Sequence, residues 1–437
     1  MTKTSNLNLI TKKICELFEY TIPGEWGIEG DPENDIPVLR STNFTNEGRI
    51  DYSNLAFRKI DPKRLALRLV NKGTILIEKS GGSPSQPAGR VVYCDEDFNG
   101  SASNFIEIAK TNNLFCPKYV FFLLHHLYQI GLVLKYQQQT TGIINFKLEQ
   151  YKNEEVLLPR DRKEQTQIAA ILSTIDRAIE QTEAIIAKQQ RIKTGLMQDL
   201  LTKGIDENGN VRSEETHEFK DSPLGRIPVE WEVQTLESIV DEPITYGIVQ
   251  AGSHIAGGIP YIRTGDMAGD SFELDKLLRT SPKIAKSYKR SEVYAGDIVF
   301  ALRATVGKVL SVPQELSGSN LTQGTAKISP MADIDETFLL WALRASIVAH
   351  QIQVVQKGTT FSEITLGELC KLRIVLPKKR EEQSIIGFQL QTRQESIQLM
   401  KTLLAKHKEA KTGLMQDLLT GNVRVTALLN DPKTAQV

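Results

Sequence analysis

The sequence has few of the residues that build metal sites or disulfides. Its 437 residues include four cysteines (Cys15, Cys94, Cys116 and Cys370), and no two of them form a C-x-x-C pair. The spacing therefore indicates neither a zinc site nor a disulfide framework, which suits a reducing cytoplasm. The six histidines are scattered and make no ligand pattern. We expect a cytoplasmic protein without a metal ion.

The motifs of several enzyme classes are also missing. There is no P-P dipeptide, so the N-P-P-[FY] type element of an amino-methyltransferase is absent. No G-x-x-x-x-G-K-[ST] loop, H-E-x-x-H helix or G-x-S-x-G turn occurs either. No strand-anchored acidic pair followed by a lysine indicates a nuclease. These absences favour binding over catalysis, and we assign no catalytic residue.

Long hydrophobic runs are lacking as well. The longest apolar run, residues 119–134, is too short and too interrupted to cross a bilayer, and it predicts a buried or half-buried helix. The first residues have no apolar core of the kind found in signal peptides. We therefore expect no membrane association.

Neither sign of charge is in excess. Lysine and arginine number 53, and aspartate and glutamate also number 53, giving a formal net charge of zero. Phosphate neutralisation normally supplies most of the affinity of a protein for duplex DNA. A nucleic-acid-binding chain of this composition must cluster its basic groups on one face or take positive charge from partner subunits, and we expect both.

What the sequence does contain is an internal duplication. The segment K-T-G-L-M-Q-D-L-L-T occurs at residues 193–202 and again, letter for letter, 218 positions later. Residues 156–165 match residues 374–383 at the same offset, while 36–43 and 72–82 match segments beginning 223 residues further on. Both halves follow one order: a strand-rich segment with glycine-bearing loops, then a long helix.

The two helices are predicted from apolar residues spaced three and four apart, from Ile168 to Leu196 and from Ile386 to Leu418. About 40 residues give a rod of roughly 60 Å. We expect that neither rod can bury its stripe against its own small domain. One stripe alone would be explained by ordinary core packing, but two near-identical stripes favour pairing as an antiparallel coiled coil. At two positions the second stripe turns polar, with Gln389 and Arg393.

The sequence therefore predicts an α+β protein with two mixed α/β domains, each followed by a long helix, the two helices pairing as an antiparallel coiled coil. The expected segments are domains at 1–158 and 229–376, helices at 159–203 and 377–423, a linker at 204–228 and a flexible tail at 424–437.

These motifs, taken together, resemble the specificity subunit of type I restriction-modification systems. Residues 219–233 look like that family's start of its second recognition domain, residues 157–172 and 375–390 like its helix starts, and the repeated decapeptide like its helix ends. One departure is that the first half lacks the I-P-x-x-W-E-V element at its start.

The resemblance implies a non-catalytic subunit that binds a bipartite, asymmetric target in double-stranded DNA, with residues 1–158 and 229–376 as target-recognition domains. It implies no cofactor of its own. Two methyltransferase subunits, which methylate adenine with S-adenosylmethionine, would bind the chain, and motor-nuclease subunits could join them. An alternative class is a coiled-coil scaffold whose globular halves bind protein. A nuclease or methyltransferase in its own right conflicts with the missing motifs.

The family's recognition surface, carried to matching positions, predicts three loops per half. Arginine can bond guanine and glutamine or asparagine can bond adenine, although any one of these side chains can equally be merely solvated. The candidates for DNA contact are Arg40, Asn43, Lys79, Ser80, Gln86, Gln138, Gln139, Thr141, Arg263, Lys286, Arg290, Arg303, Thr305, Lys308, Lys357, Thr359 and Thr360. Lys79, Arg303 and Lys357 lead this set, and Lys286 and Arg290 are expected at phosphates.

The repeated decapeptide is predicted to lie on or beside the docking surfaces for the two methyltransferase subunits, because packing alone does not demand identity at exposed polar positions. The candidates for partner contact are Lys193, Met197, Gln198, Lys411, Met415 and Gln416. With zero net charge and long apolar stripes, the chain alone is expected to bind DNA weakly and to be poorly soluble.

Overall fold

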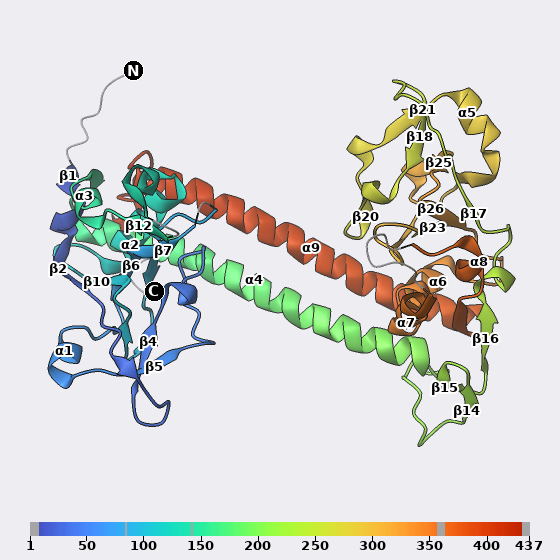
Figure 1. Ribbon diagram of the computed structural model, residues 1–437, viewed down its shortest axis with the longest axis horizontal. Coiled ribbons are helices and arrows are strands. Elements are labelled where there is room, and N and C mark those ends of the chain that lie inside the picture. Colours follow the sequence, from blue (N-terminus) through green and yellow to red (C-terminus); the bar gives the residue numbers. More distant parts are fainter. Residues whose placement is uncertain (1–7, 84, 141–142, 356–362, 431–437) are drawn as a thin grey trace. The chain divides into compact units, whose positions relative to one another are not determined.

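The computed structural model describes residues 8–83, 85–140, 143–355 and 363–430. It divides into two compact units. Unit 1 combines Met1–Glu183 with Leu403–Val437, and unit 2 is the continuous stretch Ala184–Thr402. Figure 1 colours the chain from blue to red, so both ends of the colour scale occur in unit 1.

Unit 1 is built on an antiparallel sheet of order β2-β10-β6-β8, with further sheets β3-β5-β4-β9 and β11-β12-β7 and the pair β1-β13. Its strands are β1 (Leu9–Lys13), β2 (Phe18–Pro23), β3 (Ile28–Glu29), β4 (Ile36–Leu39), β5 (Ala56–Lys59), β6 (Ile75–Glu78), β7 (Ser80–Gly82), β8 (Val91–Tyr93), β9 (Ser101–Ala102), β10 (Ile106–Thr111), β11 (Gln137–Thr140), β12 (Ile143–Phe146) and β13 (Glu155–Pro159). Its short helices are α1 (Pro62–Ala66), α2 (Pro117–Gln129) and α3 (Leu148–Tyr151). The first part of the apolar run predicted to be a buried helix is α2, in which Tyr119 and Phe122 are fully buried, so the prediction is confirmed up to Gln129. The rest of the run leaves the helix and includes the 3-10 helix Leu132–Tyr136, and Ile130 and Leu134 are exposed.

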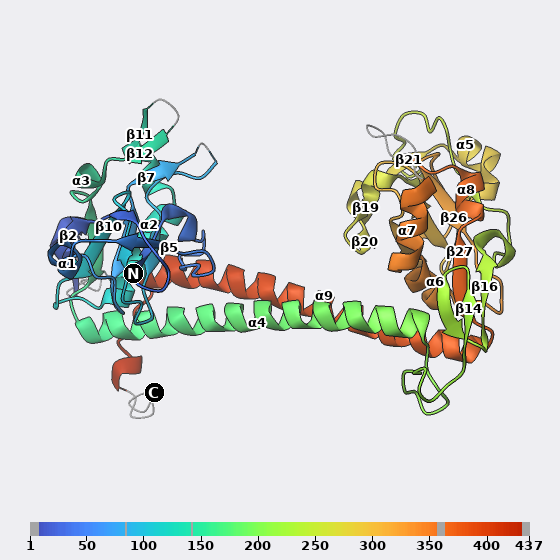
Figure 2. The same cartoon turned by 60° about the horizontal axis from the view of Figure 1, so that its bottom comes forward.

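Unit 2 repeats this plan with sheets β17-β26-β23-β24 and β21-β18-β25-β22 and the pairs β16-β27, β14-β15 and β19-β20. Its strands are β14 (Phe219–Ser222), β15 (Gly225–Pro228), β16 (Trp231–Thr235), β17 (Thr245–Tyr246), β18 (Ile259–Ile262), β19 (Met267–Ala268), β20 (Ser271–Phe272), β21 (Leu278–Thr280), β22 (Glu292–Val293), β23 (Ile298–Ala301), β24 (Val309–Ser311), β25 (Ser319–Leu321), β26 (Thr325–Ile328) and β27 (Arg373–Pro377). Its short helices are α5 (Pro282–Ser287), α6 (Glu336–Leu343), α7 (Ser346–Val355) and α8 (Leu366–Cys370). In Figure 2, α6 and α7 lie beside these strands, and α6 packs against β24 and β27.

The strand that opens each half occupies the same place in both units. β1 pairs antiparallel with β13, with Leu9 opposite Pro159, and β16 pairs antiparallel with β27, with Trp231 opposite Pro377. The first half therefore replaces the missing W-E-V element with L-I-T-K-K. The sequence pattern missed this equivalence because the two strands share a position and no residues.

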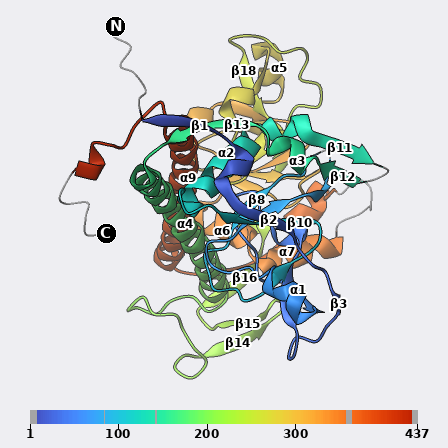
Figure 3. The same ribbon diagram turned by 90° about the vertical axis from the view of Figure 1, so that its left-hand side faces the viewer.

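Two long helices follow these domains: α4 (Arg162–Thr202) and α9 (Arg380–Leu419). In unit 1, Asp176 of α4 pairs with Lys411 of α9 at 2.7 Å and Glu183 pairs with Lys408 at 2.9 Å. The numbers rise along α4 as they fall along α9, so the pair is antiparallel, and the two helices lie side by side (Figures 1 and 3). The predicted helix pairing is confirmed.

In unit 2 the later part of α4 pairs with the first part of α9. Gln189 Oε1 accepts a hydrogen bond from Arg393 Nη1 at 2.8 Å, and Lys193 Nζ donates to Gln394 Oε1 at 2.7 Å. Arg393, one of the two polar residues in the second apolar stripe, therefore has a polar partner on the facing helix.

The expectation that neither helix buries its stripe against its own domain is wrong for the first turns. Ile168 and Leu172 join the core of unit 1 beside α2, and Ile386 and Leu390 join the core of unit 2 beside α6. The start of each helix follows a buried strand directly, so its apolar face has a core to pack against. The helix ends reach a core too, with Leu418 buried in unit 1 and Leu200 in unit 2.

A partly buried ion pair occurs at the same place in each unit. In unit 1, Glu164 at the start of α4 accepts from Arg424 at 2.7 and 2.5 Å; in unit 2, Glu382 at the start of α9 accepts from Arg212 at 2.5 and 3.2 Å. Both arginines end a G-N-V-R segment that follows a long helix. We call these the reciprocal ion pairs. The expected flexible tail thus begins with two packed residues, Arg424 and Val425.

Within the described residues, no single helix has the length and hydropathy to cross a membrane. The bent pair of α6 and α7, at 56° to one another, passes by length and composition only, and most of α6 is buried in the core of unit 2.

Candidate nucleic-acid interface

The three loops predicted in the first half come together in unit 1. β7 pairs with β12 of the β11–β12 hairpin, and the main-chain N–H of Phe146 donates to the carbonyl of Lys79 at 2.8 Å. Ser41, in the loop after β4, donates through Oγ to the carbonyl of Ser80 at 3.2 Å. Segments from three separate stretches of sequence thus form one loop cluster, which we call loop cluster 1.

A buried ion pair that the sequence analysis missed supports loop cluster 1. Arg90 donates to both carboxylate oxygens of Glu78, at 2.9 and 2.7 Å, and both side chains are buried. Its remaining donors reach the carbonyls of Phe44 at 2.7 Å and Ser41 at 2.9 Å. The signal for it was a charged residue closing the apolar strand I-L-I-E. Since the pair ties β6 to the loop after β4, it positions the loops.

The candidates in loop cluster 1 have different surroundings. Lys79 pairs with Glu107 at 3.0 Å and is 23% exposed, and Gln86 Nε2 donates to Asn46 Oδ1 at 2.5 Å. Gln138 and Gln139 are exposed on β11. Ser80 is buried, and its Oγ donates to Asn145 Oδ1 at 2.6 Å.

Arg40 and Asn43 lie in the loop after β4. Asn43 is 3% exposed; its Oδ1 accepts from the Arg40 main-chain N–H at 2.9 Å, and its Nδ2 donates to the carbonyls of Asp51 and Asn54. The Arg40 Nη2 donates to the carbonyl of Asn54 at 2.8 Å. Asn43 therefore shapes the loop, and the Arg40 guanidinium has no acidic partner among the described residues.

Unit 2 builds an equivalent cluster, loop cluster 2, with other residues. The Arg263 main-chain N–H and Nε donate to Asp266 Oδ2 at 2.8 and 3.0 Å, and its Nη2 donates to Oδ1 at 2.5 Å. This bidentate contact with a buried carboxylate raises the pKa of Arg263 above its usual value. Lys308 donates to the carbonyl of Met267 at 2.5 Å, as Arg90 does to Phe44, so Lys308 positions a loop.

Arg303 extends from loop cluster 2. It is half exposed and pairs with Glu363, also half exposed, at 3.1 Å. Thr305 beside it is exposed. Lys286 and Arg290 are exposed on the turn that includes α5 and make no ion pair within the part of the chain that the structure describes. Four of the predicted residues, Thr141, Lys357, Thr359 and Thr360, lie outside the described residues.

The charges in the two clusters largely cancel. Lys79 with Glu107, Arg263 with Asp266 and Arg303 with Glu363 are each neutralised in place. This accounts for a basic candidate set in a chain without net charge. A phosphate group that reached Arg303 would have to compete with Glu363, which lowers the gain from each contact.

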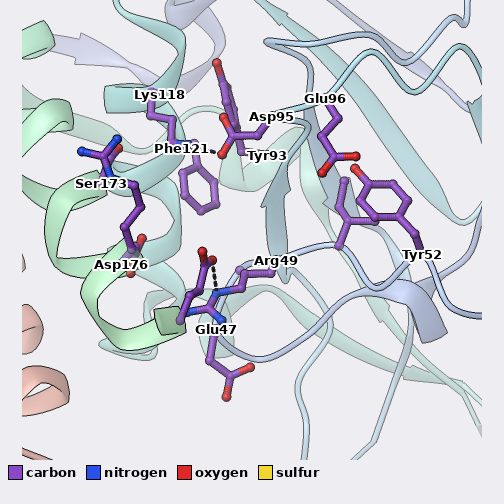
Figure 4. Close-up of a pocket in the computed structure, with 14 residues that line it drawn as sticks. Glu47, Arg49, Tyr52, Tyr93, Asp95, Glu96, Lys118, Phe121, Ser173 and Asp176 are labelled. Atoms are coloured by element: carbon purple, nitrogen blue, oxygen red, sulfur yellow. Dashed lines mark hydrogen bonds and ion pairs between the residues drawn. The ribbon is translucent and has the colours of Figure 1, made fainter. Parts of the chain in front are cut away.

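A charged cavity of about 410 Å³ in unit 1 does not share this chemistry (Figure 4). Arg49 pairs with Glu180 and Glu183, and Lys118 pairs with Asp95. Arg49 and Lys118 are held by carboxylates there, whereas Arg177 in the same lining donates to Thr174 Oγ1 at 3.2 Å and makes no ion pair among the described residues. Among the described residues, no group of three or more His, Cys, Asp or Glu side chains could hold a metal ion.

Part of the repeated decapeptide packs within the two units. Lys193 and Lys411 bond the facing helix, Met415 is 1% exposed, and Met197 packs against the core of unit 2. Gln198 and Gln416 are exposed at matching positions. Identity at the lysines therefore follows from equivalent packing in the two units, and the exposed glutamines are the members of the set left to meet a partner.

An exposed apolar face lies next to this region in unit 2. On α9, Ile385, Phe388 and Leu399 are 46%, 71% and 67% exposed. Phe388 and Leu196 of the decapeptide line a groove of about 430 Å³ with Thr392. The positions on α4 that match the three α9 residues, 218 residues earlier, are glutamine or alanine. The two helices therefore present unequal faces.

The comparisons with known proteins agree with this duplicated layout. Residues 10–189 and 228–408 each match the family model described as the type I restriction modification DNA specificity domain. The chain is 28% identical to a putative type I restriction enzyme MjaX specificity subunit of Methanocaldococcus jannaschii, covering 95% of this chain and 93% of that one. It is 26% identical to the MjaVIII specificity subunit of the same organism, covering 92% and 89%. A crystal structure of a type I restriction-modification S subunit from M. genitalium has the same fold, with a TM-score of 0.61 at 16% identity, covering 96% of this chain and 98% of that one.

Proposed function

The chain belongs to the type I restriction modification DNA specificity family, and we propose that it is the subunit that selects the DNA sequence for such a system. The observation that carries this proposal is the duplicated loop scaffold, in which an arginine follows β4 in one unit and β18 in the other. Two domains that each recognise a DNA sequence suit a bipartite target. Residues 1–158 and 229–376 serve as target-recognition domains, 159–203 and 377–423 as their helices, and 204–228 as the linker.

We assign contact with the DNA duplex to those candidate residues that are exposed or whose ion pairs a phosphate group can displace. The complex would act in the cytoplasm. These are Arg40, Lys79, Gln86, Gln138, Gln139, Lys286, Arg290, Arg303 and Thr305, together with Thr141, Lys357, Thr359 and Thr360 from outside the described residues. Arg263, which the sequence also predicted at DNA, is fixed to Asp266 by two side-chain hydrogen bonds and is assigned as a positioning residue. Asn43, Ser80 and Lys308 hold the loops in shape and act as positioning residues. Because Lys79, Arg263 and Arg303 are paired with carboxylates, the chain alone binds DNA weakly and partner subunits supply further positive charge.

The chain has no catalytic centre of its own in this proposal. Two methyltransferase subunits dock on the long helices and bring S-adenosylmethionine, and motor-nuclease subunits can join them. Gln198 and Gln416 mark the two docking faces, and Phe388 with Leu399 extends the face on α9. Met415 is buried and is left out of the docking set. We expect two methyltransferase subunits per chain at saturation, and native mass measurement that found one would contradict this.

The function is tested by exchanging one target-recognition domain. Residues 1–158 are replaced with the equivalent domain of a relative, and the host genome is sequenced for modified adenines. One half of the bipartite motif should change while the other half and the gap stay fixed. A matched exchange of residues 229–376 should change the other half alone. If both halves changed together, or if no bipartite motif were found, the proposal of two target-recognition domains would be wrong.

A further inference from the structure

A cavity of about 360 Å³ opens within loop cluster 1. It lies between the loop after β4, the turn from β6 into β7 and residues 103–105, and its lining includes Trp26, Arg40, Gly81, Asn104 and Phe105. Its volume is at the lower end of the range for small-ligand sites. One wall is held in place by the buried Arg90–Glu78 pair, which ties the loop after β4 to β6.

The lining offers flat apolar faces. Phe105 is 52% exposed, and the Arg58 guanidinium lies over one face of the Trp26 ring at 3.9 Å from its centre. Gly81 has a φ of +111°, which a side chain rarely adopts, so the backbone there is open to a close approach. Aromatic faces at an opening of this kind can stack a nucleobase of any identity, because every base has a π face.

One residue of the lining carries an unsatisfied donor. Arg40 Nε is buried and has no hydrogen-bond partner among the residues that the structure describes, while Nη2 of the same side chain donates to Asn54. A buried N–H without an acceptor is costly, so a ligand that brings an acceptor to this point gains more than a surface contact would give. The chemistry required is therefore a flat ring with an acceptor at its edge.

The equivalent place in unit 2 lacks both features. Arg263 Nε donates to Asp266, so no donor is left over. The main-chain N–H of Lys79 bonds the carbonyl of Phe105 as that of Leu302 bonds Gly324, each at 2.8 Å, which makes Gly324 the counterpart of Phe105. An aromatic face and a free donor thus occur together in unit 1, at the loops assigned to DNA contact.

We propose that this cavity receives one nucleobase turned out of the bound duplex, stacked against Phe105 and Trp26, with Arg40 Nε donating to an acceptor on the base edge. The proposal rests on the proposed function, because the DNA must lie over loop cluster 1. It adds a base-extruding step on the specificity subunit itself, distinct from any extrusion at a methyltransferase active site.

The test uses the chain assembled with its methyltransferase subunits and duplexes in which one pair at a time is mismatched across the half-site read by unit 1. A mispaired base is easier to extrude, so a mismatch at the extruded base should tighten binding by about tenfold. Phe105→Ala should reduce that gain to below about threefold. Arg40→Lys, which keeps the charge and removes Nε, should do the same and guards against a folding defect in the first variant. Leu114→Ala, an exposed residue elsewhere in unit 1, is the matched control.

The methylated adenine provides an internal reference. A mismatch there tightens binding through the methyltransferase subunit, so this gain in affinity should persist in Phe105→Ala. A gain at another position that is lost in both variants supports the proposal. Sequence-specific binding with no position at which the gain depends on Phe105 and Arg40 overturns the cavity proposal and leaves the proposed function standing. Loss of all sequence specificity in the unmodified complex overturns both.

Discussion

Units 1 and 2 share a topology but stabilise their loops with different residues. An arginine after β4 or β18 begins each loop, yet Arg40 is accompanied by Asn43 and Arg263 by Asp266. The amide accepts from the main chain alone, whereas the carboxylate also binds the guanidinium. A change from amide to carboxylate thus converts a donor available to a ligand into a fixed part of the loop. Duplication preserved the scaffold, and the scaffold tolerates different reading chemistries.

The largest effect should come from the reciprocal ion pairs. Glu382→Ala leaves the Trp231 Nε1 donor without an acceptor and removes the nearest partner of Arg212 (9% exposed), which keeps, among the described residues, only the Lys203 carbonyl at 3.5 Å and Glu230 at 3.9 Å. It should cost unit 2 about 3 kcal/mol. Glu164→Ala should cost unit 1 less, because Arg424 is 24% exposed and can be hydrated.

The cost of Glu382→Ala is measured by urea unfolding followed by fluorescence in a Trp26→Phe background, where Trp231 and Trp341 report unit 2. Glu336→Ala, from an exposed pair with Arg380, is the control at below about 1 kcal/mol. Equal costs for Glu382→Ala and the control would show that burial of the pair is unimportant.

The next effect concerns the unequal helix faces. Phe388→Ala should weaken one of two methyltransferase sites by about 2 kcal/mol, or roughly thirtyfold, because a largely exposed aromatic side chain at a groove is a strong anchor. Ala170→Phe places the same side chain at the matching position of α4 and should strengthen the other site. Titration followed by native mass measurement distinguishes the two sites. Ile130→Ala, exposed on unit 1, is the control. Equal weakening of both sites by Phe388→Ala would contradict the asymmetry.

The third prediction compares two arginines of unit 2. Arg303 pairs with a half-exposed carboxylate that it can exchange, so Arg303→Ala should cost about 1–3 kcal/mol at one base pair of the second half-site if it contacts guanine. If it contacts phosphate only, all sequences should weaken alike and the salt slope should fall by about one. Arg263→Ala should leave the buried Asp266 unpaired and reduce stability with little change in discrimination. Competition binding measurements on the assembled complex distinguish these outcomes. Relaxed specificity in Arg263→Ala alone would assign base recognition to Arg263 instead of Arg303.

The smallest effect near neutral pH is a difference in acid sensitivity, which grows only as the pH drops. Burial, with Lys411 and His126 nearby, lowers the pKa of His125 to about 3, while Arg344, the residue that follows α6 in unit 2, stays charged. The unfolded chain takes up this proton near pH 6.5 and unit 1 does not, so the unfolding midpoint of unit 1 should fall as pH drops from about 6.5 towards 3. His125→Gln should flatten that slope, and His254→Gln, exposed in unit 2, should not. Trp26 fluorescence in a Trp231→Phe, Trp341→Phe background reports unit 1. An unchanged slope in His125→Gln would assign the acid sensitivity to other groups.

Periodicity together with the internal duplication predicted the fold class and the paired helices. The stripe from Ile168 to Leu196 has one period and few interruptions, and such patterns depend on local spacing. The strand β1 was missed because its role is set by pairing with β13, 142 or more residues away, and L-I-T-K-K carries no motif that announces it. Long-range strand pairing is decided by tertiary packing rather than by local composition.

The candidate site was predicted at the level of loops and less well at the level of residues. Arg40 and Lys79 were found because loops that bind DNA need cations, and both lie in loop cluster 1. Lys308 looked identical in sequence terms, yet its ammonium bonds the carbonyl of Met267. The direction of a side chain depends on which carbonyl lies within reach, and a single sequence does not contain that distance. Arg90 was overlooked for the same reason.

The composition of the two units has a consequence for synthesis. Unit 2 is one continuous stretch, whereas unit 1 needs Leu403–Val437 to complete a core begun by Met1–Glu183. A ribosome adds about 5–20 residues per second, so the first domain emerges many seconds before Met415 and Leu418 can cover its apolar surface. During that interval the nascent first domain has an open hydrophobic edge, and it is the part of the molecule most exposed to chaperones and proteases. The second domain, although made later, can finish folding first.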